Sequence, residues 1–182
     1  KKNISKLVKT WEYRTHDNDK NSEIQTNPLI VDEKFYGVSP KLKLFSLEAK
    51  TGSERWIFDP FQSDQKYFDK EDTSIHVCRG ITYFEDKFKN AFIFYGVGSK
   101  LFKVNSLNGK PDLNFGDSGY VDLHKGLGEN SSSLYVSMTS PGVIYNNLII
   151  VGSRVSEGNP AAKGNIRAFD ANTGDLIWIF KT

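Results

Sequence analysis

The chain repeats one pattern three times, and this repetition limits its fold more than any other feature. In each copy an apolar strand is followed by a glycine-containing turn and then by an aromatic residue. Residues 44–58 and 166–180 are the clear copies, with Thr-Gly turns and the endings Arg-Trp-Ile-Phe and Ile-Trp-Ile-Phe, and residues 101–115 are a weaker one with Asn-Gly. Glycine after Asn or Thr supplies the positive φ that tight hairpins need. Each copy therefore predicts a β-hairpin.

A second strand pair precedes each copy. The pairs lie at residues 27–37, 80–96 and 140–152, and each has two apolar strands around a polar turn. Each full repeat thus offers four short strands, which is the content of one β-propeller blade. We therefore predict an all-β fold with three blades, at residues 24–60, 76–116 and 137–182, and with residues 1–15 as the outer strand of a neighbouring blade.

The spacing of the repeats indicates long blades. Trp56 and Trp178 stand at equivalent positions 122 residues apart, which is 61 residues per blade. Compact propeller repeats need only about 40–45 residues, so we expect insertions, at residues 61–75 and 111–137. A closed ring needs about four to eight blades, and three would leave exposed flanks. The sequence therefore predicts an open part of a larger propeller that depends on the remaining blades.

Charge and composition exclude several classes of protein. Lys and Arg number 24 against 22 Asp and Glu, giving a net charge of +2 without long runs of one sign, which argues against nucleic acid as a partner. The longest apolar run, residues 148–151, is far too short to span a bilayer. Cys78 is the single cysteine, which excludes an internal disulfide. The chain starts at Lys1 without a signal core, so we expect it to be cut from a longer protein.

Polar residues that precede the first strand of each blade are the candidate site. That strand lines the central channel of a propeller, and its N-terminal end lies on the same face as the turn between the second and third strands. Gln25, Arg79 and Thr139 precede the three first strands, and the turn of the third blade adds Ser153 and Glu157. We therefore expect a ring of anion-binding and cation-binding groups at the mouth of the channel.

These segments resemble the pyrroloquinoline-quinone (PQQ) dehydrogenases. The resemblance is carried by residues 25–31, 76–83, 139–144 and 152–158, by the Trp-Glu-Tyr-Arg-Thr motif at 11–15 and by Asn-Phe-Gly-Asp at 114–117. It extends over nearly all 182 residues and is most similar to the membrane-type glucose dehydrogenase branch. It implies an eight-bladed quinoprotein propeller that holds PQQ over a Ca²⁺ ion in the central channel, with this chain as the N-terminal blades.

The resemblance implies a role for each candidate residue. Arg79 would pair with a PQQ carboxylate or quinone oxygen, because a planar guanidinium suits bidentate recognition. Gln25, Thr139 and Ser153 would hydrogen-bond the acids of the cofactor, although many relatives have Glu at the position of Gln25. Glu157 would be a Ca²⁺ ligand, since hard oxygen donors suit that ion. Each residue also has a plain structural interpretation, as a loop, turn or capping side chain.

Two further residues beside Arg79 leave alternatives open. His76 would contact substrate or cofactor, or is an ordinary polar side chain with its hydrogen bonds satisfied. Cys78 stands where the alcohol-dehydrogenase branch carries an adjacent cysteine pair, which argues against a methanol-type enzyme. Its plain interpretation is a small buried residue on a strand. The aspartates at turns, Asp32 and Asp170, are expected to be structural.

The implied parent protein is an enzyme that oxidises a sugar or alcohol hydroxyl and passes electrons to a quinone or cytochrome. Such enzymes work in the periplasm or at the periplasmic face of the inner membrane. The catalytic Asp and the remaining metal ligands would lie in later blades, so this segment alone would be inactive. Two alternatives remain: a non-catalytic propeller that acts as a periplasmic binding or assembly scaffold, and a degenerate dehydrogenase-like domain without turnover.

Overall fold

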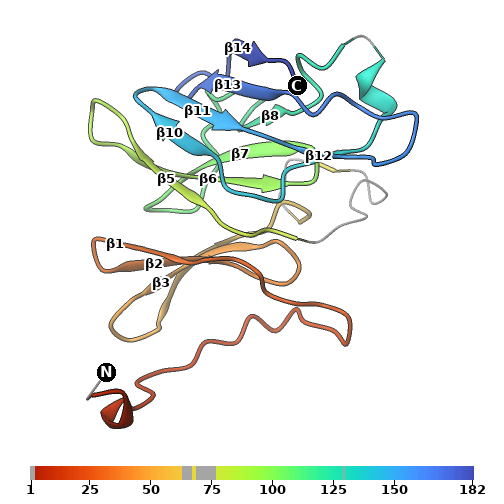
Figure 1. The fold of residues 1–182 in the computed structure, drawn as a ribbon. Helices are drawn as coiled ribbons and strands as arrows, with labels where there is room; N and C mark the ends of the chain where they lie inside the picture. Colours follow the sequence, from red (N-terminus) through yellow and green to blue (C-terminus); the bar gives the residue numbers. More distant parts are fainter. Residues whose placement is uncertain (1–2, 63–66, 69–76, 129) are drawn as a thin grey trace.

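Three antiparallel four-stranded sheets lie side by side and form an open arc (Figure 1). The computed structural model describes residues 3–62, 67–68, 77–128 and 130–182. The strands of the three sheets follow chain order: β1 (Leu29–Val31), β2 (Lys34–Val38), β3 (Leu44–Glu48) and β4 (Glu54–Phe58); β5 (Thr82–Glu85), β6 (Ala91–Val97), β7 (Lys100–Asn105) and β8 (Tyr120–Asp122); β10 (Val143–Tyr145), β11 (Leu148–Val151), β13 (Ile166–Asp170) and β14 (Leu176–Phe180). The predicted all-β fold with three propeller blades is confirmed.

The outer strand of the second blade lies further along the chain than the sequence suggested. Residues up to 116 were expected to complete this blade, but the fourth strand is β8 at residues 120–122. Positive φ angles at Gly116, Ser118 and Gly119 turn the chain before β8 begins. The 3₁₀ helix η2 (Ser131–Ser133) and a small sheet of β9 (Val136–Ser137) and β12 (Arg154–Val155) follow outside the three blades.

The N-terminal segment does not form a strand where one was expected. Its described residues 3–15 contain the 3₁₀ helix η1 (Ile4–Lys6) and otherwise irregular backbone. The segment still packs on the first blade, since the Trp11 ring meets Phe35 with a centroid separation of 6.0 Å and Tyr13 meets Phe45 at 5.0 Å. With no sheet of a preceding blade among the described residues, this stretch has no β-partner and covers the blade through its aromatic rings.

Glycine closes the hairpin between the third and fourth strands of each blade. Gly52, Gly109 and Gly174 have φ angles of +73°, +71° and +80°, which L side chains rarely adopt. A Cβ on Gly52 would lie 2.7 Å from the Trp11 ring, and one on Gly109 would lie 2.6 Å from the Trp56 ring. The turns therefore require glycine both for backbone conformation and for space.

Two tryptophans, Trp11 and Trp56, each lie over the glycine turn of the blade that follows them in the chain. The Trp11 indole N–H donates to the carbonyl of Ala49 at 3.0 Å, and that of Trp56 donates to the carbonyl of Ser106 at 3.1 Å. Each indole thus lies over the glycine turn of the next blade and satisfies its own polar group. The third tryptophan, Trp178 on β14, is 39% exposed and has no such turn to cover in the described residues.

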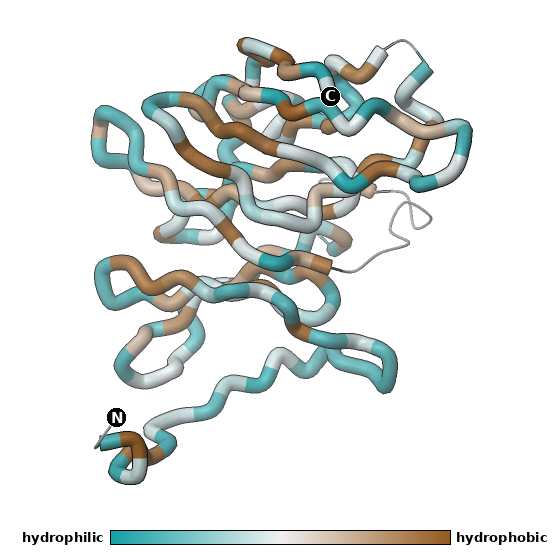
Figure 2. Tube along the Cα trace, in the orientation of Figure 1, coloured by the Kyte–Doolittle hydropathy of each residue, from teal (hydrophilic) through white to brown (hydrophobic). Residues whose placement is uncertain are grey.

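The apolar core consists of two layers, one on each side of the second blade. Successive residues of β6 alternate between them, so that Ile93 and Tyr95 face the first blade while Phe92 and Phe94 face the third. Figure 2 shows hydrophobic stretches along the strands of the blades and hydrophilic turns between them. The alternation of side chains along one strand therefore packs a single sheet against two neighbours.

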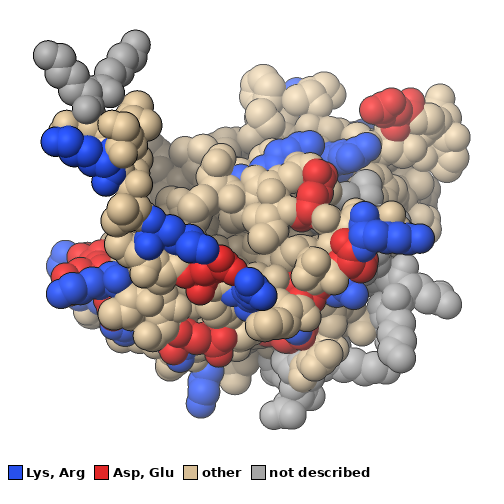
Figure 3. All heavy atoms as spheres, turned by 90° about the horizontal axis from the view of Figure 1, so that it is seen from below, with Lys and Arg blue, Asp and Glu red and all other residues tan. Residues whose placement is uncertain are grey.

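The two flanks of the arc differ from each other. On the N-terminal flank, the outward side of the first blade, Lys and Arg are interspersed with Asp and Glu (Figure 3). The C-terminal flank, the outward side of the third blade, exposes large apolar side chains, namely Val143, Tyr145, Trp178 and Phe180. None of the described helices is long and apolar enough to cross a membrane.

Candidate functional site

The three segments that lead into β1, β5 and β10 run next to one another on one face of the arc. We call them the lead-in segments, residues 25–28, 78–81 and 139–142. The backbone N–H of Asn27 donates to the carbonyl of Arg79 at 3.1 Å, and that of Arg79 donates to the carbonyl of Thr139 at 2.8 Å. The Thr26 hydroxyl donates to the carbonyl of Cys78 at 2.6 Å. Main-chain hydrogen bonds therefore fix the spacing of the three segments.

Two glycines allow this close approach. A Cβ on Gly80 would lie 3.0 Å from the Pro141 ring, and one on Gly96 would lie 2.5 Å from the Met138 side chain. The backbone N–H of Met138 donates to the carbonyl of Gly98 at 2.8 Å. The chain of the third blade is thereby pressed against the second blade immediately before Thr139.

The side chains of Gln25, Arg79 and Thr139 meet, as the sequence predicts. Arg79 Nε donates to Gln25 Oε1 at 3.3 Å, and one Nη donates to Thr139 Oγ1 at 3.4 Å. Arg79 is exposed, whereas Thr139 is buried. A guanidinium carries five N–H donors, and in the described part of the chain Arg79 forms no ion pair with a carboxylate. Gln25 Nε2 in turn donates to the carboxylate of Glu23, so among the described residues Arg79 has unused N–H donors and no direct ion pair.

Ser153 and Glu157 lie on the same face but are not part of this contact. β12 pairs with β9 so that Arg154 stands opposite Ser137, which brings Ser153 toward the third lead-in segment. Ser153 Oγ accepts a hydrogen bond from Arg167 Nη2 at 2.5 Å. Glu157 is exposed, and the described residues contain no group of three or more His, Cys, Asp or Glu that could hold a metal.

Three further residues were considered from the sequence: His76, Cys78 and Asp170. His76 lies outside the described residues. Cys78 is buried, with its Sγ 3.3 Å from the carbonyl of Gly80, and burial raises the pKa of its thiol. The carboxylate of Asp170 accepts the backbone N–H of Asn172 at 2.8 Å, as a turn residue does. Both positions agree with the structural interpretation that the sequence favoured.

Arg167 is a residue that sequence reasoning missed. It lies on β13, where side chains alternate, and it faces inward on the same side as Phe169. It is fully buried, and it donates to the carbonyls of Leu123 and Lys125 as well as to Ser153. The sequence does carry one indication of it: a charged residue stands at a strand position where the alternating pattern predicts an apolar, inward-facing side chain.

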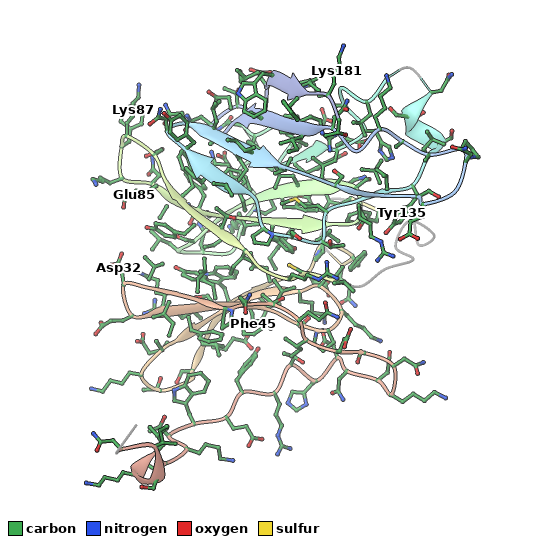
Figure 4. All side chains as sticks on the ribbon, in the orientation of Figure 1. Asp32, Phe45, Glu85, Lys87, Tyr135 and Lys181 are labelled. Atoms are coloured by element: carbon green, nitrogen blue, oxygen red, sulfur yellow. The ribbon has the colours of Figure 1, made fainter. Side chains whose placement is uncertain are left out.

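The two ends of the blades carry different kinds of residue. Figure 4 shows Asp32, Glu85 and Lys87, which lie in or beside the β1–β2 and β5–β6 turns, at one end of the sheets, and Tyr135 at the other. The lead-in segments lie at the Tyr135 end, because each first strand runs from them toward the opposite turns. The candidate site therefore occupies a single face of the propeller arc.

Comparison with known proteins identifies the family of this fold. All of residues 1–182 match the family described as PQQ, glucose/ethanol/alcohol dehydrogenase, beta-propeller domain. The chain belongs to this family. The quinoprotein glucose dehydrogenase of Escherichia coli (strain K12) is 30% identical over 198 residues, covering 98% of this chain and 24% of the relative. The quinate/shikimate dehydrogenase (quinone) of Acinetobacter baylyi is 30% identical over 207 residues, with 98% and 24% covered.

A solved structure has the same fold. The quinohemoprotein alcohol dehydrogenase ADHIIG from Pseudomonas putida HK5 superposes with a TM-score of 0.69 at 21% identity, over 91% of this chain and 21% of that one. The chain spans about a quarter of the length of the curated relatives named above. The resemblance that the sequence motifs indicated is thus confirmed as membership of the family.

Proposed function

We propose that this chain is the N-terminal part of a PQQ- and Ca²⁺-dependent dehydrogenase that oxidises a sugar or alcohol hydroxyl. In this proposal the chain supplies one wall of the cofactor pocket. The observation that carries it is the cluster of Arg79, Gln25 and Thr139, which joins three blades on one face. Membership of the PQQ family supports the choice of cofactor.

The donor set fits PQQ, which is a planar quinone with several carboxylates. Arg79 retains N–H donors beyond those used by Gln25 and Thr139, and a guanidinium binds a carboxylate through two parallel hydrogen bonds. The amide nitrogen of Gln25 already donates to Glu23 and has one further N–H for a cofactor oxygen, and the hydroxyl of Thr139 can donate as well. In this proposal all three bind and orient the cofactor, and Ser153 joins them from the neighbouring turn.

The fit to calcium is partial. Ca²⁺ takes six to eight oxygen ligands, whereas the proposed metal-binding residue of this chain is the exposed carboxylate of Glu157. We propose that Glu157 supplies one ligand and that later blades supply the others, together with the base that removes the substrate proton. The segment alone would then neither hold the ion tightly nor oxidise a substrate.

The proposed reaction sets the partners of the whole protein. When bound, PQQ supplies the two-electron oxidation of the hydroxyl-bearing carbon. The electrons would leave for a quinone or a cytochrome, and the protein would work in the periplasm or at the periplasmic face of the inner membrane. His76 remains a candidate for substrate or cofactor contact under this proposal.

Isothermal titration of the full-length protein with PQQ, with and without Ca²⁺, tests the proposal. We expect tight binding that needs Ca²⁺. Arg79→Ala should weaken it by at least about tenfold, because a hydrogen bond to a charged group contributes about 1.5–3 kcal/mol. Glu157→Ala should raise the Ca²⁺ concentration that tight PQQ binding needs, because it removes one of several ligands of the ion.

The matched control is Arg55→Ala. Arg55 lies on the outer strand β4, where it pairs with Glu48 at 2.6 Å, so its loss should leave PQQ affinity unchanged. A wild-type protein that does not bind PQQ would contradict the proposal. A non-catalytic propeller scaffold would then be the leading account.

A further inference from the structure

Arg167 is a fully buried cation that connects the second and third blades. Its guanidinium donates to the carbonyls of Leu123 and Lys125, which follow the outer strand of the second blade, and to Ser153 Oγ. Its Nε is buried without a hydrogen-bond partner in the described residues. Desolvation lowers the pKa of Arg167 to about 10, so the side chain is charged at neutral pH. Its hydrogen-bond partners are uncharged, and the Asp122 carboxylate acts on it only through space; a buried charge without a direct counter-ion is costly for stability.

A second buried cation at the same blade interface has a different environment. Lys103 on β7 pairs with Asp112 at 2.8 Å and lies 4.0 Å from the centroid of the Phe92 ring. Its charge is therefore compensated by a carboxylate and an aromatic face. In the described part of the chain Arg167 forms no ion pair, and the negative charge that acts on it through space is that of Asp122 on β8.

The chemistry of the guanidinium determines how Ser153 can bind a ligand. Arginine has only N–H donors, so in its contact with Arg167 the Ser153 oxygen must be the acceptor. The hydroxyl proton then points elsewhere, and the described residues offer it no acceptor. Ser153 is half-buried, so this proton can reach a ligand on the site face. In a low-dielectric interior such a chain of hydrogen bonds polarises the hydroxyl and strengthens its donation.

We propose that Arg167 is a positioning residue that fixes Ser153 as a hydrogen-bond donor toward an anionic oxygen of the bound cofactor. The inference rests on the proposed function, because the anion is a PQQ carboxylate. It adds a residue behind the pocket wall that does not touch the cofactor itself. Arg167 would act on the cofactor only through the Ser153 hydroxyl that it orients and polarises.

The test is a double-mutant cycle in the full-length protein, read as PQQ affinity by isothermal titration in the presence of Ca²⁺. The variants are Ser153→Ala, Arg167→Met and the double variant, with Arg55→Met as the matched control for loss of an arginine. We expect each single variant at 153 or 167 to weaken binding by about tenfold, the effect of one hydrogen bond to a charged group. The double variant should bind PQQ no less tightly than the single variant with the lower affinity. Ser153→Thr, which keeps the hydroxyl, should retain most of the affinity.

The cycle separates positioning from a purely structural role. If Arg167 only clamps the turn at residues 123–125, or contacts PQQ itself, its effect will multiply with that of Ser153→Ala, and the inference is overturned. Unchanged affinity in Arg167→Met also overturns it. Should Arg167→Met not fold in thermal unfolding, Arg167→Lys replaces it, since an ammonium keeps the charge but lacks the fork that reaches Ser153 and the carbonyls together. A wild-type protein without PQQ affinity overturns this inference and the proposed function together, whereas multiplying effects overturn this inference alone.

Discussion

The second and third blades have the same strand order, yet their environments differ. The second blade has a neighbour on each side, and the side chains of its inner strands β6 and β7, such as Tyr95 and Phe102, are fully buried. Among the described residues the third blade has a neighbour on one side only, and Tyr145 and Phe180 on its other side are 65% and 62% exposed. The third blade is thus apolar on both sides, although only one side has a neighbouring blade among the described residues.

The tryptophans show what the difference means for the fold. Trp56 is buried over the glycine turn of the second blade, whereas Trp178, at the equivalent position of the third blade, is 39% exposed. The same sequence pattern is present at Trp178, but the part of the chain that the structure describes has no glycine turn beneath its indole. Large apolar side chains that are exposed side by side, such as Tyr145, Trp178 and Phe180, mark an interaction surface. This agrees with our expectation that further blades continue the arc.

The largest expected effect comes from removing a ring in the middle of the arc. Phe102→Ala on β7 should lower the free energy of unfolding by about 3–5 kcal/mol, because the ring is fully buried and leaves a cavity. Phe180→Ala in this 182-residue chain should change it by less than about 0.5 kcal/mol, since that ring is exposed. Urea unfolding followed by tryptophan fluorescence measures both. Equal effects would show that the two blades do not differ as described.

The next largest effect tests the hairpin turns. Gly109→Ala should cost about 2–4 kcal/mol, because its φ is +71° and the new Cβ would lie 2.6 Å from the Trp56 ring. Gly152→Ala is the control, since a Cβ there would meet nothing within 4 Å and its backbone is not left-handed. The same urea unfolding compares the two. A tolerated alanine at 109 would mean that Trp56 does not lie over this turn.

A smaller effect concerns the response of the second blade to alkaline pH. Burial raises the pKa of Tyr95 well above its usual range, and its hydroxyl has no partner in the described residues. The unfolded chain releases this proton near pH 10, so stability is complete below about pH 10 and falls as the pH rises above it. Tyr95→Phe should be close to neutral at pH 7 and should lessen the alkaline loss. Thermal unfolding across pH measures this, and an identical pH profile for the variant would contradict it.

The smallest expected effect lies on the outer strand of the first blade. Arg55→Ala removes an ion pair with Glu48 whose side chains are 40% and 28% exposed. Exposed pairs contribute about 0–1 kcal/mol and are screened by salt. Urea unfolding at low and high salt should show a loss within that range that shrinks with salt. A loss of several kcal/mol would mean that this strand is more deeply buried than described.

Much of the fold could be predicted from the sequence because its signals are local. The Thr-Gly and Asn-Gly turns fix hairpins through φ, and the alternation along residues such as Ile93 and Phe94 fixes sheets with two apolar sides. The outer strand of the second blade was misplaced, because Gly116, Ser118 and Gly119 delay its pairing and such a detour has no periodic pattern. The N-terminal segment was expected to be a strand, but it packs on the first blade through its aromatic side chains. Such contacts between distant parts of the chain are not visible in a local pattern.

The candidate site was predictable only in part. Arg79, Gln25 and Thr139 come together because the strand order of a propeller brings the lead-in segments side by side, which the repeats predict. The contact of Ser153 with Arg167 was not predicted, since it depends on how β13 lies behind the β11–β12 turn. Long-range contacts of single side chains have no signature in spacing or composition.

The structure of the full-length protein with bound PQQ and Ca²⁺ tests the central claim most directly. The account predicts that the Arg79 guanidinium lies within hydrogen-bonding distance of a cofactor oxygen, with Gln25 and Thr139 beside it and Glu157 on the metal. It also predicts that a further blade covers Trp178 and Phe180. PQQ bound at another face of the propeller, or Arg79 paired with a carboxylate from another blade, would contradict the account.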